Sequence, residues 1–147
     1  MEKAMGINIF SGEKGLGGAL TNPTEIAYRK RAIVNQYPVV VRGVNFISAE
    51  AAYQNMKIPG DTAFNDMLMV KIIHIKLKTH PRLFNEIKRL GGRSFLESCT
   101  HYTYAKTASA KSWEGSGMDS RFIRNLVGAY EMLEAGIEND YENAPQV

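Results

Sequence analysis

The sequence predicts an α+β fold, in the form of a compact, helix-rich single domain with a small β-sheet. Its length of 147 residues is typical of one domain, and a chain of this size buries roughly 68–70% of its unfolded surface. Apolar residues recur at helical spacing in several segments, whereas β-branched runs are few and short. We therefore expect one domain over residues 1–137 and an acidic, frayed tail over residues 138–147.

The composition excludes several classes of protein. Apolar residues make up 44% of the chain and charged residues 22%, which is typical of a globular protein and not of a disordered one. No apolar run is long enough for a signal peptide or a membrane span, so we expect a soluble cytoplasmic protein with no membrane partner. The single cysteine, Cys99, excludes an internal disulfide framework and fits a reducing compartment.

The charge balance is mildly basic, with a formal net charge of +3 and a pI near 9.0. This balance is compatible with an anionic ligand or a nucleic acid, and equally with a solvated basic surface. The dense basic cluster is Arg29-Lys30-Arg31. It either contacts phosphate or lies in a solvated loop.

The N-terminal part shows only short patterns. Residues 6–10 alternate enough for a short strand, and the glycine-rich stretch 11–18 matches neither a Walker loop nor a dinucleotide fingerprint. Residues 20–23 predict a turn in which Asn22 either presents its amide to a ligand or only organises the turn. Residues 24–36 show no firm period.

The next stretch predicts a strand, a turn and a helix. Residues 39–41 are all valine, and Arg42-Gly43 suits a turn. Ser48 suits the N-cap of a helix that carries Glu50 in its first turn. The same helix carries the polar side chains that suggest a binding site.

Two further helices are expected downstream. Apolar residues at helical spacing predict a buried helix over residues 63–78, in which Lys76 near the end is either solvated or functional. Pro81 suits the first turn of the next helix, which should stop at Gly91-Gly92.

The chain that follows should be less regular. Residues 94–99 are typical of a short strand, and the polar residues 100–112 predict a loop that is functional or mobile. This loop leads to Trp113, which suits stacking on a base or sugar, or packing in the core. Asp119 or Ser120 then suits the cap of a last helix.

Four polar residues fall on one side of the helix that Ser48 caps. They are Glu50, Tyr53, Gln54 and Lys57. A side facing the core would carry Leu, Ile or Val, so this pattern predicts the polar wall of a pocket. The alternative is that the acid and the amine lie on a solvated helix edge.

A carboxylate and an amine beside a polar pocket suit chemistry at the anomeric carbon of a sugar. The carboxylate can stabilise the positive charge that develops there, while an acid protonates the leaving base. A neutral lysine amine can instead add to the opened ribose aldehyde and form a Schiff base. The histidines His74, His80 and His101 lack the spacing of a zinc site, and no Gly-x-Ser-x-Gly elbow is present. We expect neither a metal nor another cofactor.

These residues resemble the NADAR family, also called YbiA-like. Its central signature is similar to a Gly followed by Ser-x-Glu-x-x-Tyr/Phe-Gln-x-x-Lys, which this chain matches from Gly43 through Ser48 to Lys57. The resemblance covers roughly residues 6–136. It also includes Leu20-Thr21-Asn22, Met69, Lys76, His80-Pro81, Leu96-Glu97, Trp113, Gly115, Gly117, Asn125, Gly128 and Met132.

The resemblance implies a YbiA-like fold and N-glycosidase activity at ribose. Family members are associated with removing ADP-ribose from guanine in DNA or RNA, or with cleaving ribosylamine intermediates of riboflavin synthesis. Glu50 would then be the catalytic carboxylate and Lys57 the amine placed for a Schiff base, with Lys76 as a second lysine for that role. The residues that would shape the ribose, phosphate and base pockets are Asn22, Tyr53, Gln54, Lys76, Glu97, Trp113 and Asn125.

The chain departs from the family pattern near the tryptophan. Ala110 stands where the family usually has an aspartate, Glu114 stands where glycine is common, and residues 100–112 form a longer loop. These departures affect the expected substrate choice more than the chemistry. They leave open a sensor that binds NAD or ADP-ribose without hydrolysis, or a nucleic-acid-binding protein that acts through Arg29-Lys30-Arg31.

Overall fold

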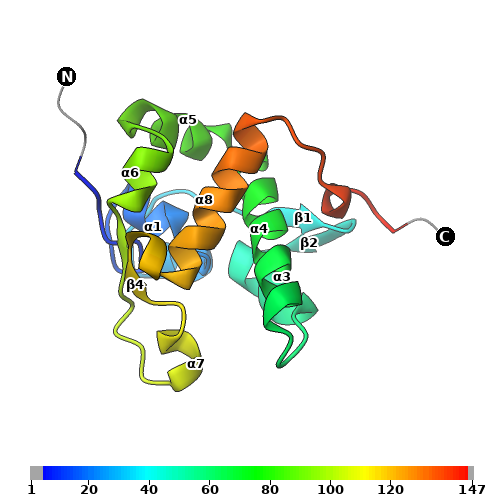
Figure 1. Ribbon diagram of the computed structural model, residues 1–147, viewed down its shortest axis with the longest axis horizontal. Coiled ribbons are helices and arrows are strands. Elements are labelled where there is room, and N and C mark those ends of the chain that lie inside the picture. Colours follow the sequence, from blue (N-terminus) through cyan, green and yellow to red (C-terminus); the bar gives the residue numbers. More distant parts are fainter. Residues whose placement is uncertain (1–4, 146–147) are drawn as a thin grey trace.

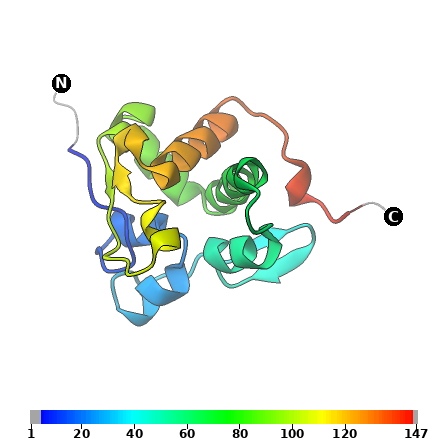
Figure 2. The same cartoon turned by 60° about the horizontal axis from the view of Figure 1, so that its bottom comes forward.

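Two long helices form the centre of the computed structural model, which describes residues 5–145. Helix α4 (Thr62–Thr79) begins where the Asp61 carboxylate accepts a hydrogen bond from the Phe64 amide, 3.0 Å away. It packs most extensively against α8 (Arg121–Glu134), and the two helices lie side by side (Figures 1 and 2). Side chains are buried around most of α4, as expected for a helix in the middle of a core.

A short hairpin packs against α4. Strand β1 (Val39–Val41) pairs antiparallel with β2 (Val44–Phe46), with Val41 opposite Val44. Arg42 and Gly43 between the strands both have positive φ, 54° and 79°, which is the backbone of a two-residue hairpin turn. The predicted strand and turn are confirmed, and the return strand β2 was not predicted.

The helices that the caps and the apolar spacing predicted are present. Ser48 caps α3 (Ala49–Met56) by accepting from the Ala51 amide at 3.1 Å, and Ser120 caps α8 in the same way. Helix α5 (Pro81–Leu90) has Pro81 in its first turn and ends at Gly91.

The less regular segments contain more helix than the sequence patterns indicated. Residues 24–36 contain a helix, α2 (Thr24–Arg29), preceded by the short α1 (Leu16–Leu20). Residues 94–99 are not a strand, because α6 (Arg93–Glu97) buries Phe95 and Leu96 on one helical face. The polar loop contains a four-residue helix, α7 (Ala108–Lys111).

The expected first strand is reduced to one bridge, between Asn8 and Thr100. Thr100 belongs to β3 (Thr100–His101), which pairs antiparallel with β4 (Gly115–Ser116) and leads into the 3-10 turn η1 (Gly117–Asp119). The α+β prediction is therefore confirmed, with two small two-stranded sheets in place of one.

The tail expected to fray is docked over part of its length. The 3-10 turn η2 (Asp140–Glu142) buries Tyr141, whose ring centre lies 4.2 Å from the guanidinium of Arg42 and 4.8 Å from the amine of Lys71. The Asn139 amide also donates to the Lys71 carbonyl at 2.9 Å. Arg42 and Lys71 thus contact the Tyr141 ring and also pair with the Asp140 carboxylate, and these contacts hold residues 139–142 against α4 and the hairpin. None of the helices within residues 5–145 has the length and apolar character needed to cross a bilayer.

Candidate active site

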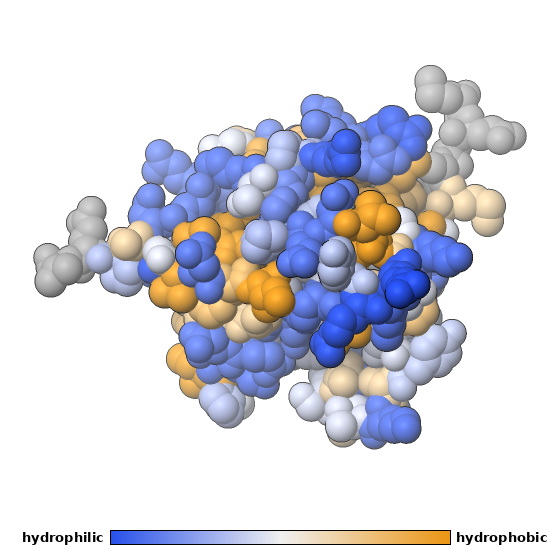
Figure 3. Space-filling model, turned by 180° about the vertical axis from the view of Figure 1, so that it is seen from behind, coloured by the Kyte–Doolittle hydropathy of each residue, from blue (hydrophilic) through white to orange (hydrophobic). Residues whose placement is uncertain are grey.

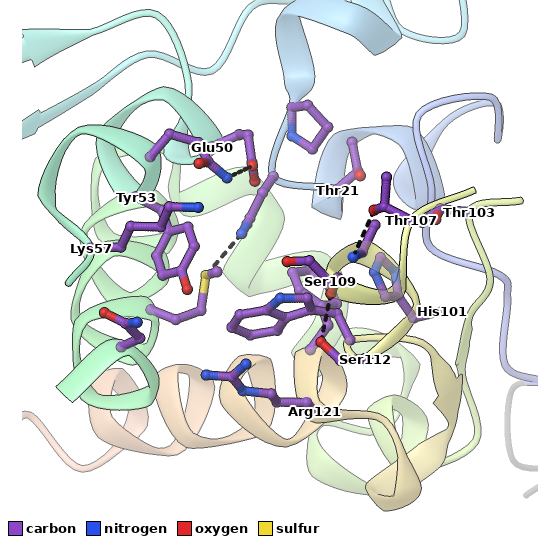
Figure 4. Close-up of a pocket in the computed structure, with 18 of the residues that line it drawn as sticks. Thr21, Glu50, Tyr53, Lys57, His101, Thr103, Thr107, Ser109, Ser112 and Arg121 are labelled. Atoms are coloured by element: carbon purple, nitrogen blue, oxygen red, sulfur yellow. Dashed lines mark hydrogen bonds between the residues drawn. The ribbon is translucent and has the colours of Figure 1, made fainter. Parts of the chain in front are cut away.

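A pocket of about 690 Å³ lies between α3, the start of α4, the start of α8 and the loops at residues 20–23 and 101–113. Its volume is in the range of small-molecule sites. Seen from behind, the lower edge of the molecule is notched between the part that carries α7 and the turn before α4 (Figure 3). Polar side chains from these elements surround the pocket (Figure 4).

Six of the nine residues selected from the sequence line this pocket. They are Asn22, Glu50, Tyr53, Gln54, Lys57 and Trp113. The polar face of α3 is thus a pocket wall and not a solvated edge. The other three, Lys76, Glu97 and Asn125, are not among the residues that line the pocket.

Glu50 is half-buried in the first turn of α3. Its Oε1 accepts a hydrogen bond from the Gln54 amide at 2.7 Å, and its backbone amide donates to the Asn22 carbonyl at 3.2 Å. Burial raises the pKa of Glu50, the neighbouring Glu25 raises it further, and Gln54 and Lys57 oppose the shift. A carboxyl with a raised pKa beside a pocket is suited to proton transfer.

Lys57 lies at the C-cap of α3, where its amide donates to the Tyr53 carbonyl at 2.9 Å. The turn after it is fixed by the buried Asn65, which accepts from the Ile58 amide at 2.9 Å and donates to the Ile58 carbonyl at 2.8 Å. The Lys57 amine lies 6.0 Å from the centre of the Tyr53 ring. The cap and the turn therefore hold Lys57 on the same pocket wall as Glu50.

Lys76 is neither solvated nor part of the pocket lining. Its side chain is buried, and its Nζ donates to the Thr21 carbonyl at 2.7 Å. The next residue, Asn22, accepts the Glu50 amide, so Lys76 supports the backbone that receives the start of α3. Burial lowers the pKa of Lys76 to about 7, and the charge of Glu25 opposes this shift only partly.

Lys76 should make the protein more stable as the pH rises above neutral. Its pKa falls from 10.5 to about 7 on folding, so between these values the unfolded chain holds the extra proton. The free energy of unfolding then increases with pH, by at most about 1.4 kcal/mol per pH unit. Urea unfolding at pH 7, 8 and 9 should show this rise in the wild type and not in Lys76→Met.

The matched control for Lys76 is Lys78→Met, since Lys78 is an exposed lysine on the same helix. It should keep the wild-type rise. Parallel stability profiles for wild type and Lys76→Met would contradict the assignment of the pH dependence to Lys76.

An aromatic wall faces α3 across the pocket. Trp113 meets Tyr53 edge to face, with ring centres 5.6 Å apart and planes at 84°. The guanidinium carbon of Arg121 lies 3.8 Å from the centre of the Trp113 ring. One face of Trp113 is therefore occupied by Arg121 and is not available to stack on a base.

Glu97 and Asn125 have other roles. Glu97 is exposed, and its carboxylate pairs with Arg93 at 2.5 Å on α6, outside the pocket lining. Asn125 is buried and donates to Asp66 Oδ1 at 3.1 Å. The same oxygen accepts from Arg121 Nε at 2.6 Å, so Asp66 links Asn125 to Arg121, which lines the pocket.

Several residues that line the pocket were not predicted from the sequence. His101 was considered in the sequence only as a zinc ligand, but it is buried, lines the pocket and stacks on Phe122 at 4.4 Å. Its Nδ1 is 2.7 Å from the Ile9 carbonyl, and burial lowers the pKa of the ring. The hydroxyl-rich character of residues 100–112 was a usable signal, since four of these side chains line the pocket: Thr103, Thr107, Ser109 and Ser112.

The departures from the family pattern lie at this loop. Ala110 lines the pocket without supplying a polar group. Glu114 accepts from the Thr103 amide at 2.6 Å and from its hydroxyl at 3.0 Å, and these hydrogen bonds lower the pKa of Glu114. Glu114 therefore holds the start of the loop over residues 100–112 in place through Thr103.

The part of the chain that the structure describes contains no group of three His, Cys, Asp or Glu side chains able to hold a metal ion. No family model, curated protein or solved structure matches this chain. Membership of the NADAR family remains a prediction from the sequence motifs.

Proposed function

We propose that this protein is an N-glycosidase of the kind that the NADAR resemblance implies. Its substrate is an ADP-ribosyl or ribosyl-phosphate adduct, and the preferred reaction is the removal of ADP-ribose from guanine in nucleic acid. One observation carries the proposal: Glu50, with its raised pKa, and Lys57 share the wall of a pocket of nucleotide size.

Hydrolysis breaks the bond between the anomeric carbon and a guanine nitrogen. The electron pair of this bond leaves with guanine, and the protonated Glu50 carboxyl gives its proton to the leaving nitrogen. A water oxygen then bonds the anomeric carbon, and the Glu50 carboxylate takes the proton that the water releases. The products are unmodified guanine and ADP-ribose, and Glu50 returns to its starting state.

Lys57 supports a covalent form of the same reaction. Its neutral amine bonds the anomeric carbon, while guanine leaves with the electron pair of the glycosidic bond and takes one proton from the amine. The bond between the anomeric carbon and the ring oxygen then breaks, the second amine proton moves to that oxygen, and a Schiff base forms between Lys57 and the opened sugar. Water then hydrolyses the Schiff base and returns the amine. Between the two lysines that the resemblance implies, Lys57 suits this role better because it lines the pocket and Lys76 does not.

A basic rim favours an adduct carried on a nucleic acid. Ser11 lines the pocket, and its hydroxyl accepts a hydrogen bond at 2.7 Å from Lys30, the centre of the basic cluster. Tyr104, which is 80% exposed, packs edge to face on Phe10 beside Ser11. Exposed aromatic and basic side chains next to a pocket are typical of surfaces that bind single strands.

The test is a comparison of three substrates at equal concentration: an oligonucleotide with ADP-ribosylated guanine, the free ADP-ribosylated nucleoside, and a ribosylamine phosphate. We expect fastest cleavage of the oligonucleotide. Fastest cleavage of the ribosylamine phosphate would instead favour a metabolic N-glycosidase.

The absence of a polar group at Ala110 favours a second candidate, a sensor that binds ADP-ribose without hydrolysis. Calorimetry would then show saturable ADP-ribose binding, while none of the three substrates would give a product.

A further inference from the structure

We infer that Arg121 forms a phosphate-binding site in this pocket, across from Glu50. The ligand class is a ribosyl compound that carries a phosphate monoester or diphosphate. This inference deepens the proposed function, because it names the group by which the pocket recognises its substrate.

The guanidinium of Arg121 has an unused edge that faces the pocket. Its Nε donates to Asp66 Oδ1 at 2.6 Å, and its plane lies over Trp113 at 3.8 Å. Within residues 5–145, Nη1 and Nη2 have no hydrogen-bond partner. Arg121 lines the pocket, and Figure 4 places it on the side opposite Glu50, with its guanidinium directed inward.

The guanidinium is held in place before any ligand arrives. Asp66, which accepts the Nε hydrogen, is itself oriented by the Asn125 amide at 3.1 Å. The Trp113 carbonyl accepts from the Ser120 hydroxyl at 2.7 Å, which fixes the tryptophan relative to the start of α8. Groups held in this way lose little conformational freedom on binding.

The surroundings of Arg121 favour an anion. Its side chain is only 18% exposed, so its remaining N–H groups are poorly hydrated. In its protonated form, Lys57 adds a second cation to the same pocket. A planar guanidinium with two adjacent free N–H donors matches the oxygens of phosphate in a bidentate geometry.

The competing interpretations are a purely structural arginine and an arginine that reads the guanine base. A structural arginine would lose stability on substitution without a change in ligand choice. A base-reading arginine would contact guanine O6 and N7. The two interpretations and the phosphate site give different results with ligands that contain or lack each group.

The experiment measures the Kd of ADP-ribose, AMP, adenosine and guanosine by calorimetry, for wild type, Arg121→Gln and Arg121→Lys. Wild type should bind ADP-ribose and AMP more tightly than adenosine. Arg121→Gln should raise the Kd of ADP-ribose and of AMP about tenfold and leave the Kd values of adenosine and guanosine unchanged. Arg121→Lys should bind ADP-ribose and AMP more tightly than Arg121→Gln does and less tightly than the wild type. Lysine keeps the positive charge but lacks the two adjacent N–H donors of the guanidinium.

The matched control is Arg124→Gln, which removes the same charge from the same helix at an exposed position outside the pocket lining. It should leave all four Kd values unchanged. Equal weakening of AMP and adenosine by Arg121→Gln, a selective loss of guanosine, or no change with any ligand would overturn the inference. If phosphate recognition by Arg121 holds but no adduct is cleaved, the glycosidase proposal fails and the phosphate site stands.

Discussion

The Glu50→Gln variant should remove ADP-ribose from guanine about a thousandfold more slowly than the wild type, because general acid–base catalysis contributes on this scale. Its melting temperature should stay close to that of the wild type. The glutamine oxygen can still accept the hydrogen bond that Gln54 now gives to Glu50, and the backbone hydrogen bond to Asn22 is untouched. Single-turnover rates and thermal unfolding of the same preparations measure both expectations.

Glu97→Gln is the control for that variant. The family resemblance assigns Glu97 to the site, yet this carboxylate is exposed and paired with Arg93. We therefore expect wild-type turnover from Glu97→Gln. An active Glu50→Gln protein, or equal losses in the two variants, would remove Glu50 from its catalytic role.

The Lys57→Arg variant should lose activity by about a thousandfold or more, the scale on which loss of a nucleophile acts. Arginine keeps the positive charge but cannot form a Schiff base with the sugar. Borohydride added during turnover should trap a sugar on the wild-type protein, and peptide mapping should locate it at Lys57. An amine attacks only when neutral, so the yield of trapped protein should increase with pH.

Lys111→Arg is the control for Lys57, since Lys111 is an exposed lysine of α7 that does not line the pocket. It should retain both turnover and trapping. A sugar trapped at Lys76 would exclude Lys57 as the nucleophile. Full activity in Lys57→Arg without any trapped sugar would exclude the covalent route and leave hydrolysis assisted by Glu50 alone.

The pocket wall on α3 could be predicted because it depends on local signals. Ser48 caps the helix through the Ala51 amide, three residues away. Helical periodicity then places Glu50, Gln54 and Lys57 on one side, whatever the rest of the chain does. The hairpin turn at Gly43 was predictable for the same reason.

The opposite side of the site depends on contacts between residues far apart in the sequence. Arg121 reaches Asp66 across 55 positions, and Lys76 reaches Thr21 across the same separation. Nothing near Lys76 in sequence indicates that its amine is buried against a carbonyl. Nothing near His101 in sequence indicates that it lines the pocket, because its partners, Ile9 and Phe122, are distant from it in the sequence.

The prediction of a frayed tail failed for a related reason. The acidic composition of the tail is typical of a frayed end, and its docking depends on contacts with Arg42 and Lys71, which are distant in the sequence. The helix α6 was misread because Phe95 and Leu96 are adjacent, a pattern that a short buried strand and a short helix share.

The most direct test of the central claim is mass spectrometry of an oligonucleotide bearing ADP-ribosylated guanine, after incubation with purified wild-type protein or Glu50→Gln. The glycosidase proposal predicts loss of the ADP-ribose mass and recovery of the unmodified oligonucleotide with the wild type alone. Persistence of the adduct with both proteins would contradict removal of ADP-ribose from guanine.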